Sequence, residues 1–139
     1  MVDKELIINK LQELNRYLKE LEDSKNISLD EFHSSIGKQW MVCHGIQLSI
    51  QSLIDVGNHI LAALGENQIE DYSDIIDKLG ERNILPSEFA QSIRGMVGLR
   101  NILVHEYARL DIKIIYDILQ NQLEDFYMFT KHINQFLNR

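Results

Sequence analysis

The first part of the chain alternates apolar and polar positions with the period of an α-helix. From residue 7 to residue 21, leucine and isoleucine recur at steps of 4, 3, 4 and 3. Such steps place side chains on one face of a helix, so the pattern predicts a helix of about 20 residues with one buried stripe. The polar residues 23–26 end it. The stripe consists of Ile7, Leu11, Leu14, Leu18 and Leu21.

A second, unusually long helix is predicted from Ser28 to about Leu64. Ser28 is followed three residues later by Glu31, which is the form of a capping box. Apolar residues then keep a helical spacing along one face. That face carries Val42, Ile46, Ile50, Leu53, Ile60 and Leu64.

The opposite stripe of this helix is polar, but only Asp55 in it is charged. A stripe that faces water normally carries Lys and Glu, so this one predicts a polar cleft or a wet subunit interface. An exposed, uncharged stripe is the alternative. The members of this polar stripe are His44, Gln47, Gln51, Asp55 and Asn58.

Three helices are predicted in the second half of the chain. A short one covers residues 71–79, and the turn at Leu85-Pro86 precedes another from about Ser87, which carries Arg100 near its end. Asp111 suits the N-cap of the last helix. The expected core residues of the last two helices are Phe89, Ile93, Met96, Val97, Ile102, Ile115, Ile118 or Leu119, Phe126, Phe129, Ile133 and Phe136.

These elements predict an all-α fold, an antiparallel four-helix bundle with an additional short helix. No repeat or linker interrupts residues 1–139, so we expect a single domain. One proline and seven glycines leave few residues for the turns of an all-β fold. No run approaches the roughly 18 apolar residues of a membrane span and no signal peptide is evident, so we expect a cytoplasmic protein.

No cofactor or metal is expected. The single cysteine, Cys43, excludes an internal disulfide and lies in an apolar stretch, where we expect a buried thiol. The Glu-x-x-His motif of di-metal bundles does not occur, and neither do the glycine-rich loops that bind phosphate.

Charge is distributed unevenly along the chain. The net charge of −7 argues against a broadly basic surface that coats nucleic acid. Residues 94–113 nevertheless carry four basic side chains against two acidic ones, whereas residues 66–93 carry two basic against seven acidic. We therefore expect a local phosphate site in the basic segment, and neither DNA nor a membrane as a partner.

Most of the reactive side chains lie in residues 95–107. Arg100 supplies a planar fork of donors suited to phosphate, and His105 exchanges a proton near neutral pH. The two lie roughly 140° apart on a straight helix, so either the helix ends here or a second chain completes the pair. The alternative is that both only stabilise a helix C-terminus.

Arg100-Asn101, His105 and Tyr107 resemble the R-x4-H-x-Y signature of the HepT family in the HEPN superfamily. Residues 55–60 also resemble the polar motif on the long second helix of that family. The resemblance implies an HEPN-like fold and a ribonuclease toxin of a type VII-like toxin–antitoxin pair.

The resemblance further implies partners and site residues. It places Asp55, with His59 one turn further along, near the reaction centre of a homodimer whose cleft lies at the interface. An MntA-like nucleotidyltransferase antitoxin is implied to attach AMP to Tyr107, and a larger hetero-oligomer with this antitoxin is one implied assembly. The alternative for Tyr107 is a half-buried ring that closes the core.

Two functions are consistent with these residues. In the first, a metal-independent endoribonuclease uses the 2′-hydroxyl of RNA as nucleophile, His105 transfers protons, Arg100 stabilises phosphate charge, and Asn101 orients His105 or a phosphate oxygen. The expected products are a 5′-hydroxyl and a 2′,3′-cyclic phosphate. In the second, a non-catalytic HEPN-like helical module binds a nucleotidyltransferase or a nucleotide.

Overall fold

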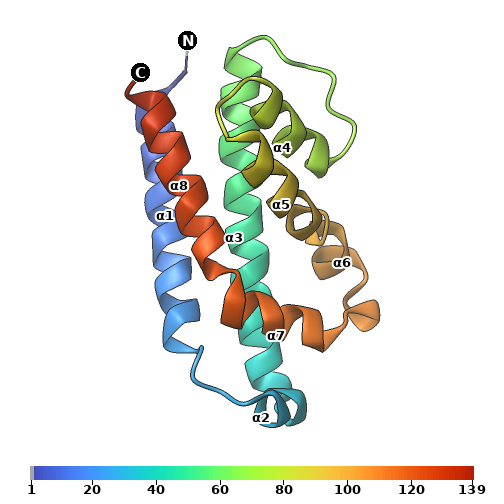
Figure 1. Ribbon diagram of the computed structural model, residues 1–139. Coiled ribbons are helices and arrows are strands. Elements are labelled where there is room, and N and C mark those ends of the chain that lie inside the picture. The colour runs from blue at the N-terminus through green and yellow to red at the C-terminus, as the bar shows by residue number, and fades with distance from the viewer. Residues whose placement is uncertain (1) are drawn as a thin grey trace.

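The structure, a computed structural model, describes residues 2–139, and all regular structure in this range is helical, as the sequence predicts. Helix α3 runs through the middle, with α1 and α8 on one side and α4, α5 and α6 on the other (Figure 1). The helices are α1 (Lys4–Asp23), α2 (Leu29–Ser34), α3 (Ile36–Ala63), α4 (Tyr72–Glu81), α5 (Ser87–Val97), α6 (Arg100–His105), the 3-10 helix η1 (Tyr107–Arg109), α7 (Ile112–Asn121) and α8 (Leu123–Leu137).

Four antiparallel arms form the bundle, as predicted. They are α1, α3, α5 with α6, and α7 with α8, and the short α4 packs beside α5 (Figure 1). Every member of the predicted stripe of α1, from Ile7 to Leu21, is buried. The predicted apolar face of α3 is buried as well, except for Leu64, which lies just beyond the helix and is 36% exposed.

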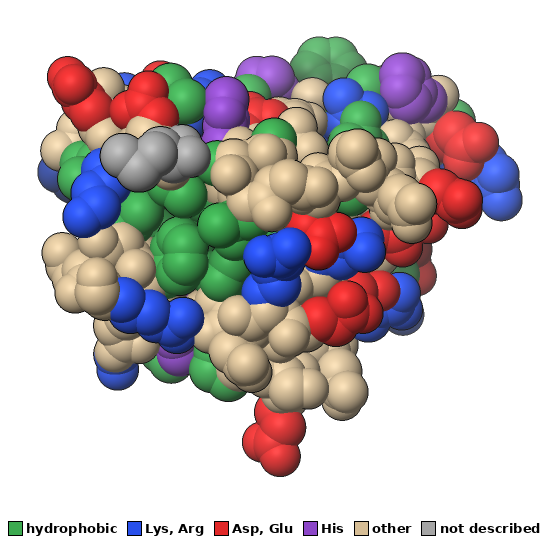
Figure 2. Space-filling view, turned by 90° about the horizontal axis from the view of Figure 1, so that it is seen from above, with side chains coloured by type: hydrophobic (Ala, Val, Ile, Leu, Met, Phe, Trp, Pro, Cys, Tyr) green, Lys and Arg blue, Asp and Glu red, His purple; other side chains and the backbone are tan. Residues whose placement is uncertain are grey.

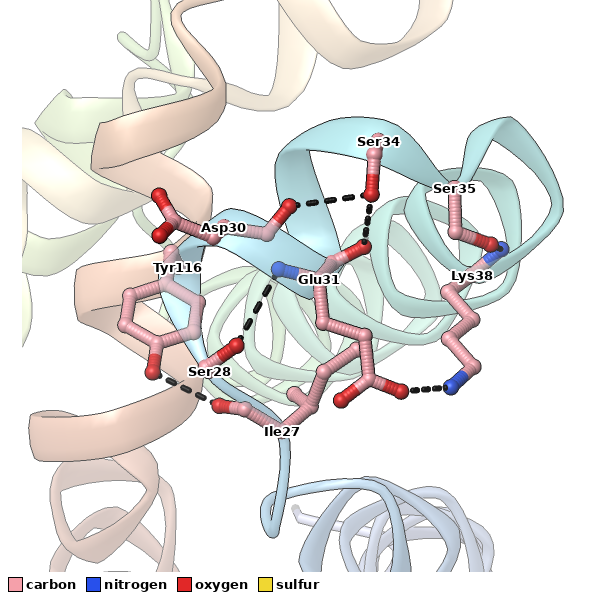
Figure 3. Close-up of polar contacts among 8 residues, drawn as sticks. All are labelled: Ile27, Ser28, Asp30, Glu31, Ser34, Ser35, Lys38 and Tyr116. Carbon is pink, nitrogen blue, oxygen red and sulfur yellow. Dashed lines mark hydrogen bonds and ion pairs between the residues drawn. The ribbon is translucent and has the colours of Figure 1, made fainter.

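The predicted helix from residue 28 to residue 64 is in fact two helices, because the backbone is extended at Ser35. The Ser28 side chain accepts a hydrogen bond from the Glu31 backbone N–H (3.1 Å), as a capping residue does (Figure 3). The Glu31 carboxylate, however, accepts from Lys38 Nζ (2.6 Å). Ser35 then caps α3 by accepting from the Lys38 backbone N–H (3.3 Å). Ser35 has no glycine or proline directly next to it, so the sequence did not predict this break.

Helix α7 fixes the loop that joins α1 to α2. The Tyr116 hydroxyl donates to the Ile27 carbonyl (2.7 Å; Figure 3), and the Gln120 amide donates to the Lys25 carbonyl (2.6 Å). These bonds satisfy loop carbonyls that have no helical partner. Helix α7 is thereby joined to the α1–α2 loop near the lower end of the bundle in Figure 1.

The predicted fourth and last helices are each interrupted. Arg100 begins the short α6 instead of ending a long helix. At Leu99 the backbone N–H bonds to the carbonyl of Met96, three residues back (3.1 Å), which tightens the turn before α6. Asp111 caps α7 as predicted, but the backbone leaves the helical conformation at Gln122. Among the expected core residues, those only partly buried are Phe89, Ile102 and Phe136.

Helix α4 approaches α3 closely at Gly57, which is buried. A Cβ atom at this position would lie 2.5 Å from Cγ2 of Ile75 and 3.1 Å from Cδ1 of Leu79. The start of α4 is fixed as well, since the Asp71 and Asp74 carboxylates each accept from the backbone N–H of the other (both 3.2 Å). The first turn of α4 is therefore held firmly against α3.

The end of the molecule that carries both termini is shown in Figure 2. Acidic and basic side chains are interspersed over this face, and no broad area of one sign is visible. This face therefore offers no broadly basic surface to nucleic acid. Within residues 2–139, no helix combines the length and the apolar character that a membrane crossing requires.

Candidate active site

Arg100 contacts side chains from two neighbouring helices. Its Nε donates to Oε1 of Gln51 on α3 (3.0 Å), and its Nη1 donates to the side-chain oxygen of Asn101 (3.2 Å). Its guanidinium carbon lies 4.9 Å from the centre of the Tyr72 ring on α4. A cation–π contact of this kind contributes about 0.5–1 kcal/mol when partly exposed. Neutral groups therefore hold Arg100, the side chain that we predict to bind phosphate, in place.

Gln51 is itself oriented by further contacts. Its Nε2 donates to Oδ1 of Asp55 (2.9 Å), and the other oxygen of Asp55 lies 3.7 Å from Nζ of Lys10 on α1. An ionised carboxylate only accepts hydrogen bonds, so the amide nitrogen of Gln51 faces Asp55 and its oxygen faces Arg100. Asp55 thus acts on Arg100 through Gln51.

A cavity of about 440 Å³ lies between α3, the start of α4 and the loop that precedes it. Gln51, Asp55 and Asn58 from the polar stripe line it together with Asn101, which confirms a polar cleft for these members of the stripe. His44 is exposed and lies outside the lining. The remaining lining residues are Ile54, Ile69, Glu70, Asp71, Tyr72 and Ile75.

Arg100 differs from two other arginines of the basic segment in its partners. Arg94 binds the Asp77 carboxylate through two hydrogen bonds (3.0 and 3.1 Å), and Arg109 pairs with Glu106 (3.2 Å). The ion pairs formed within residues 2–139 do not include Arg100. Arg100 can therefore bind a phosphate without first giving up a carboxylate.

His105 lies at the opposite end of α6 and is exposed. Five residues along an α-helix rotate a side chain by about 140° and advance it by about 7.5 Å. Arg100 contacts α3 and α4, so the two side chains do not converge within one chain. The alternative in which both cations stabilise a helix C-terminus fails for Arg100, which stands at the N-terminus of α6.

Tyr107 opens η1, directly after the α6 segment, and is 38% exposed. The nearby thiol of Cys43 on α3 is buried, as predicted. Burial raises the pKa of the Cys43 thiol to about 11, and the Tyr107 hydroxyl lowers it in part. Burial, and then the proximity of Cys43, raise the pKa of the Tyr107 phenol. Tyr107 is thus exposed and reachable from outside, and it is not one of the partly buried side chains packed on the core, which the alternative of a core-closing ring required.

The two residues expected beside the reaction centre on α3 differ in their placement. Asp55 lines the cavity and contacts Gln51, whereas His59 is exposed and lies outside the lining. Sequence reasoning did not identify Tyr72 or Lys10 as contributors. Both come from other helices, and no motif connects them to Arg100.

Comparison with known proteins gives a consistent result. The model of a protein family described as "Ribonuclease HepT-like" matches residues 8–133. The chain is 33% identical over 132 residues to the tRNA nuclease HepT of Aphanizomenon flos-aquae, a match that covers 95% of this chain and 90% of that protein. It is 29% identical over 125 residues to the mRNA nuclease HepT of Shewanella oneidensis, with coverage of 90% and 93%.

Solved structures show the same similarity. A crystal structure of a toxin–antitoxin with AMP-PNP contains a chain that superposes with a TM-score of 0.86 at 27% identity, covering 94% of this chain and 98% of that one. The tri-AMPylated Shewanella oneidensis HEPN toxin in complex with its MNT antitoxin gives a TM-score of 0.84 at 29% identity, with coverage of 93% and 96%. The predicted HEPN-like fold is therefore confirmed.

Proposed function

This chain belongs to the HepT-like ribonuclease family, and we propose that it is the toxin of a toxin–antitoxin pair, a metal-independent endoribonuclease. The observation that carries the proposal is Arg100. Its guanidinium is fixed by neutral partners and shares a six-residue helix with an exposed imidazole. The nuclease names of the two relatives and the toxin–antitoxin complexes support the same function.

The proposed reaction needs one nucleophile, which the RNA supplies. The 2′-oxygen attacks the phosphorus of the adjacent 3′-phosphate, and the bond from phosphorus to the 5′-oxygen breaks. An imidazole takes the 2′-hydroxyl proton, and a protonated imidazole gives a proton to the departing 5′-oxygen. His105 carries out these transfers, each of which typically contributes about 10² to 10⁴ in rate. The products are a 2′,3′-cyclic phosphate and a 5′-hydroxyl.

Arg100 and Asn101 act on the phosphate in this mechanism. Free N–H groups of Arg100 bind the oxygens on which negative charge develops. The side-chain oxygen of Asn101 accepts from Arg100, so its amide nitrogen is left to donate to a phosphate oxygen. Removing one such donor typically costs about 10²-fold or more in kcat.

A homodimer completes the site in this proposal. Arg100 and His105 diverge within one chain, so one copy alone does not bring both groups to the same phosphate. A second copy that presents its own α6 would supply the missing group. Mixing Arg100→Ala with His105→Ala protein tests this directly, because a mixed dimer places an intact arginine opposite an intact histidine. Partial recovery of activity is expected, and no recovery would contradict the two-chain site.

Neutralisation is proposed to occur at Tyr107. A nucleotidyltransferase of the MntA type would transfer AMP from ATP: the phenol oxygen attacks the α-phosphorus, pyrophosphate leaves, and the phenolic proton passes to a base. Support comes from the 38% exposure of Tyr107 and from the AMPylated relative bound to its antitoxin. Coexpression with such a partner should add AMP-sized mass increments to the wild type and none to Tyr107→Phe. Neutralisation of Tyr107→Phe that equals the wild type would instead show inhibition by binding alone.

The nuclease activity is tested with a single-stranded RNA and the same oligonucleotide carrying 2′-deoxyribose. We expect cleavage of the RNA only, undiminished by EDTA, with cyclic-phosphate ends resolved by mass spectrometry. His105→Ala protein, purified identically, serves as the control for contaminating nucleases. Equal digestion by wild type and His105→Ala would support the non-catalytic binding module. Loss of cleavage in EDTA with 3′-hydroxyl products would contradict the metal-independent mechanism.

A further inference from the structure

We propose that Gln51 and Tyr72 are positioning residues that hold the Arg100 guanidinium ready for a phosphate before RNA arrives. The inference rests on the proposed function, in which Arg100 binds the scissile phosphate. It concerns two residues that lie outside the R-x4-H-x-Y signature and on different helices, α3 and α4.

Gln51 fixes one edge of the guanidinium. Its oxygen accepts from Nε of Arg100 (3.0 Å), and the direction of its amide is set by the Asp55 carboxylate, which accepts from Nε2 (2.9 Å). A neutral acceptor is the suitable choice here. A carboxylate at the same distance would bind Arg100 as an ion pair and compete with the negative charge of the substrate.

Tyr72 contributes an aromatic ring. Its contact with the guanidinium does not use any N–H donor. The ring centre lies 4.9 Å from the guanidinium carbon. The capping box of Asp71 and Asp74, together with the close packing of α4 on Gly57, fixes the backbone from which this ring projects. The ring therefore holds the cation in place without neutralising it.

The donors that remain determine how the substrate is met. Of the five N–H groups of a guanidinium, Gln51 takes the one on Nε and Asn101 takes one on Nη1. No side chain or carbonyl within residues 2–139 hydrogen-bonds to Nη2. Arg100 thus presents a defined, unoccupied edge, and a long side chain that is already ordered loses less entropy when it binds phosphate.

The kinetic test compares Gln51→Met, which keeps the length of the side chain and removes both hydrogen bonds, with Gln51→Glu, which adds a charge. Tyr72→Leu removes the ring, and Tyr72→Phe restores it. We expect Gln51→Met and Tyr72→Leu to lower kcat by about tenfold to a hundredfold, as misplacement of a catalytic group does. Gln51→Glu should be at least as impaired, and Tyr72→Phe should recover most of the loss in Tyr72→Leu. Gln12→Met, at an exposed position on α1, controls for the glutamine exchange.

A second measurement does not depend on catalysis. The Nε–H resonance of Arg100, assigned by its disappearance in Arg100→Lys, should exchange slowly with water in the wild type because Gln51 binds it. Exchange should become at least tenfold faster in Gln51→Met, while circular dichroism shows the same helicity. Unchanged exchange together with unchanged kcat in that variant would overturn the inference. A wild type that exchanges slowly but cleaves no RNA would instead refute the proposed function and leave the positioning role of Gln51 intact.

Discussion

The two sides of α3 are held by different interactions. The core side, represented by Ile50, Leu53 and Ile60, is fully buried and packs against other apolar side chains. The polar side, represented by Gln51 and Asp55, is only half-buried and binds its neighbours through hydrogen bonds and a weak ion pair. The two sides belong to the same helix, and Ile50 and Gln51 are consecutive residues.

The difference separates stability from chemistry. Burying one large apolar side chain contributes about 1.5–3 kcal/mol, whereas one hydrogen bond contributes a net 0.5–1.5 kcal/mol, roughly half as much. The core side therefore supplies most of the folding free energy. The polar side contributes less to folding, but it keeps Arg100 oriented and accessible. Substitutions on the two sides should have opposite profiles, which the following predictions exploit.

The largest effect is expected from Arg100→Ala on the polar side. Removing the guanidinium should lower RNA cleavage by about 10²-fold or more, because the developing phosphate charge loses its main donor. The free energy of unfolding should change far less, by about 1 kcal/mol, since Gln51 and Asn101 are partly exposed and can bind water in place of the lost guanidinium. Parallel cleavage assays and urea titrations provide both values. A loss of several kcal/mol in stability would show that the polar side also carries the fold.

Leu53→Ala on the core side should give the converse result. It leaves a cavity at a fully buried position and should destabilise the protein by about 2–5 kcal/mol. Cleavage per folded molecule should stay near the wild-type value at a temperature where the variant remains folded. Urea unfolding followed by circular dichroism, with the cleavage assay at low temperature, checks the pair of outcomes. Activity lost in excess of the unfolded fraction would argue against the separation.

Gly57→Ala should affect both sides at once. The added methyl would meet Cγ2 of Ile75 at 2.5 Å, so the Ile75 side chain or α4 itself must shift, and a shift of α4 would carry Tyr72 with it. Overpacking of this kind typically costs about 1–3 kcal/mol. We expect a lower melting temperature together with weaker cleavage in the folded protein. Gly37→Ala, where an added Cβ meets nothing within 4 Å, is the matched control.

The smallest effect concerns Cys43, which lies on the same helix under Tyr107. Its pKa is raised to about 11 in the folded protein, from an ordinary value of 9.0. The folded state therefore holds the thiol proton more tightly, so the stability that it contributes is complete below pH 9 and declines as pH rises towards 11. Unfolding titrations of wild type and Cys43→Ser across this window should converge as pH increases. Parallel curves would show that Cys43 does not titrate in this window.

Much of this arrangement was predictable from spacing alone. The stripe from Ile7 to Leu21 and the core side of α3 follow the helical period because burial is a strong and local signal. For Gln51, Asp55 and Asn58 the polar stripe also predicted a cleft correctly, because a row of mostly uncharged polar side chains is unusual at a surface in contact with water. The signature itself identified the segment that carries Arg100.

Other features depend on contacts between helices and could not be read from local spacing. The break at Ser35 depends on one serine that caps a second helix, and the short α6 depends on a tightened turn at Leu99. The approach of Tyr72 to Arg100 requires the packing of α4 on α3. A residue pattern describes one helix at a time, so it cannot specify which ring meets which cation.

The brevity of α6 has a consequence for how the protein opens. A six-residue helix is far below the length at which a helix is stable by itself, and Leu103 is its one buried side chain. Backbone amides of residues 100–105 should therefore exchange with deuterium well before those in the middle of α3, through local fluctuations that leave the bundle intact. The segment that carries the proposed catalytic groups would then be the first to unfold on heating, so loss of RNA cleavage should precede global melting.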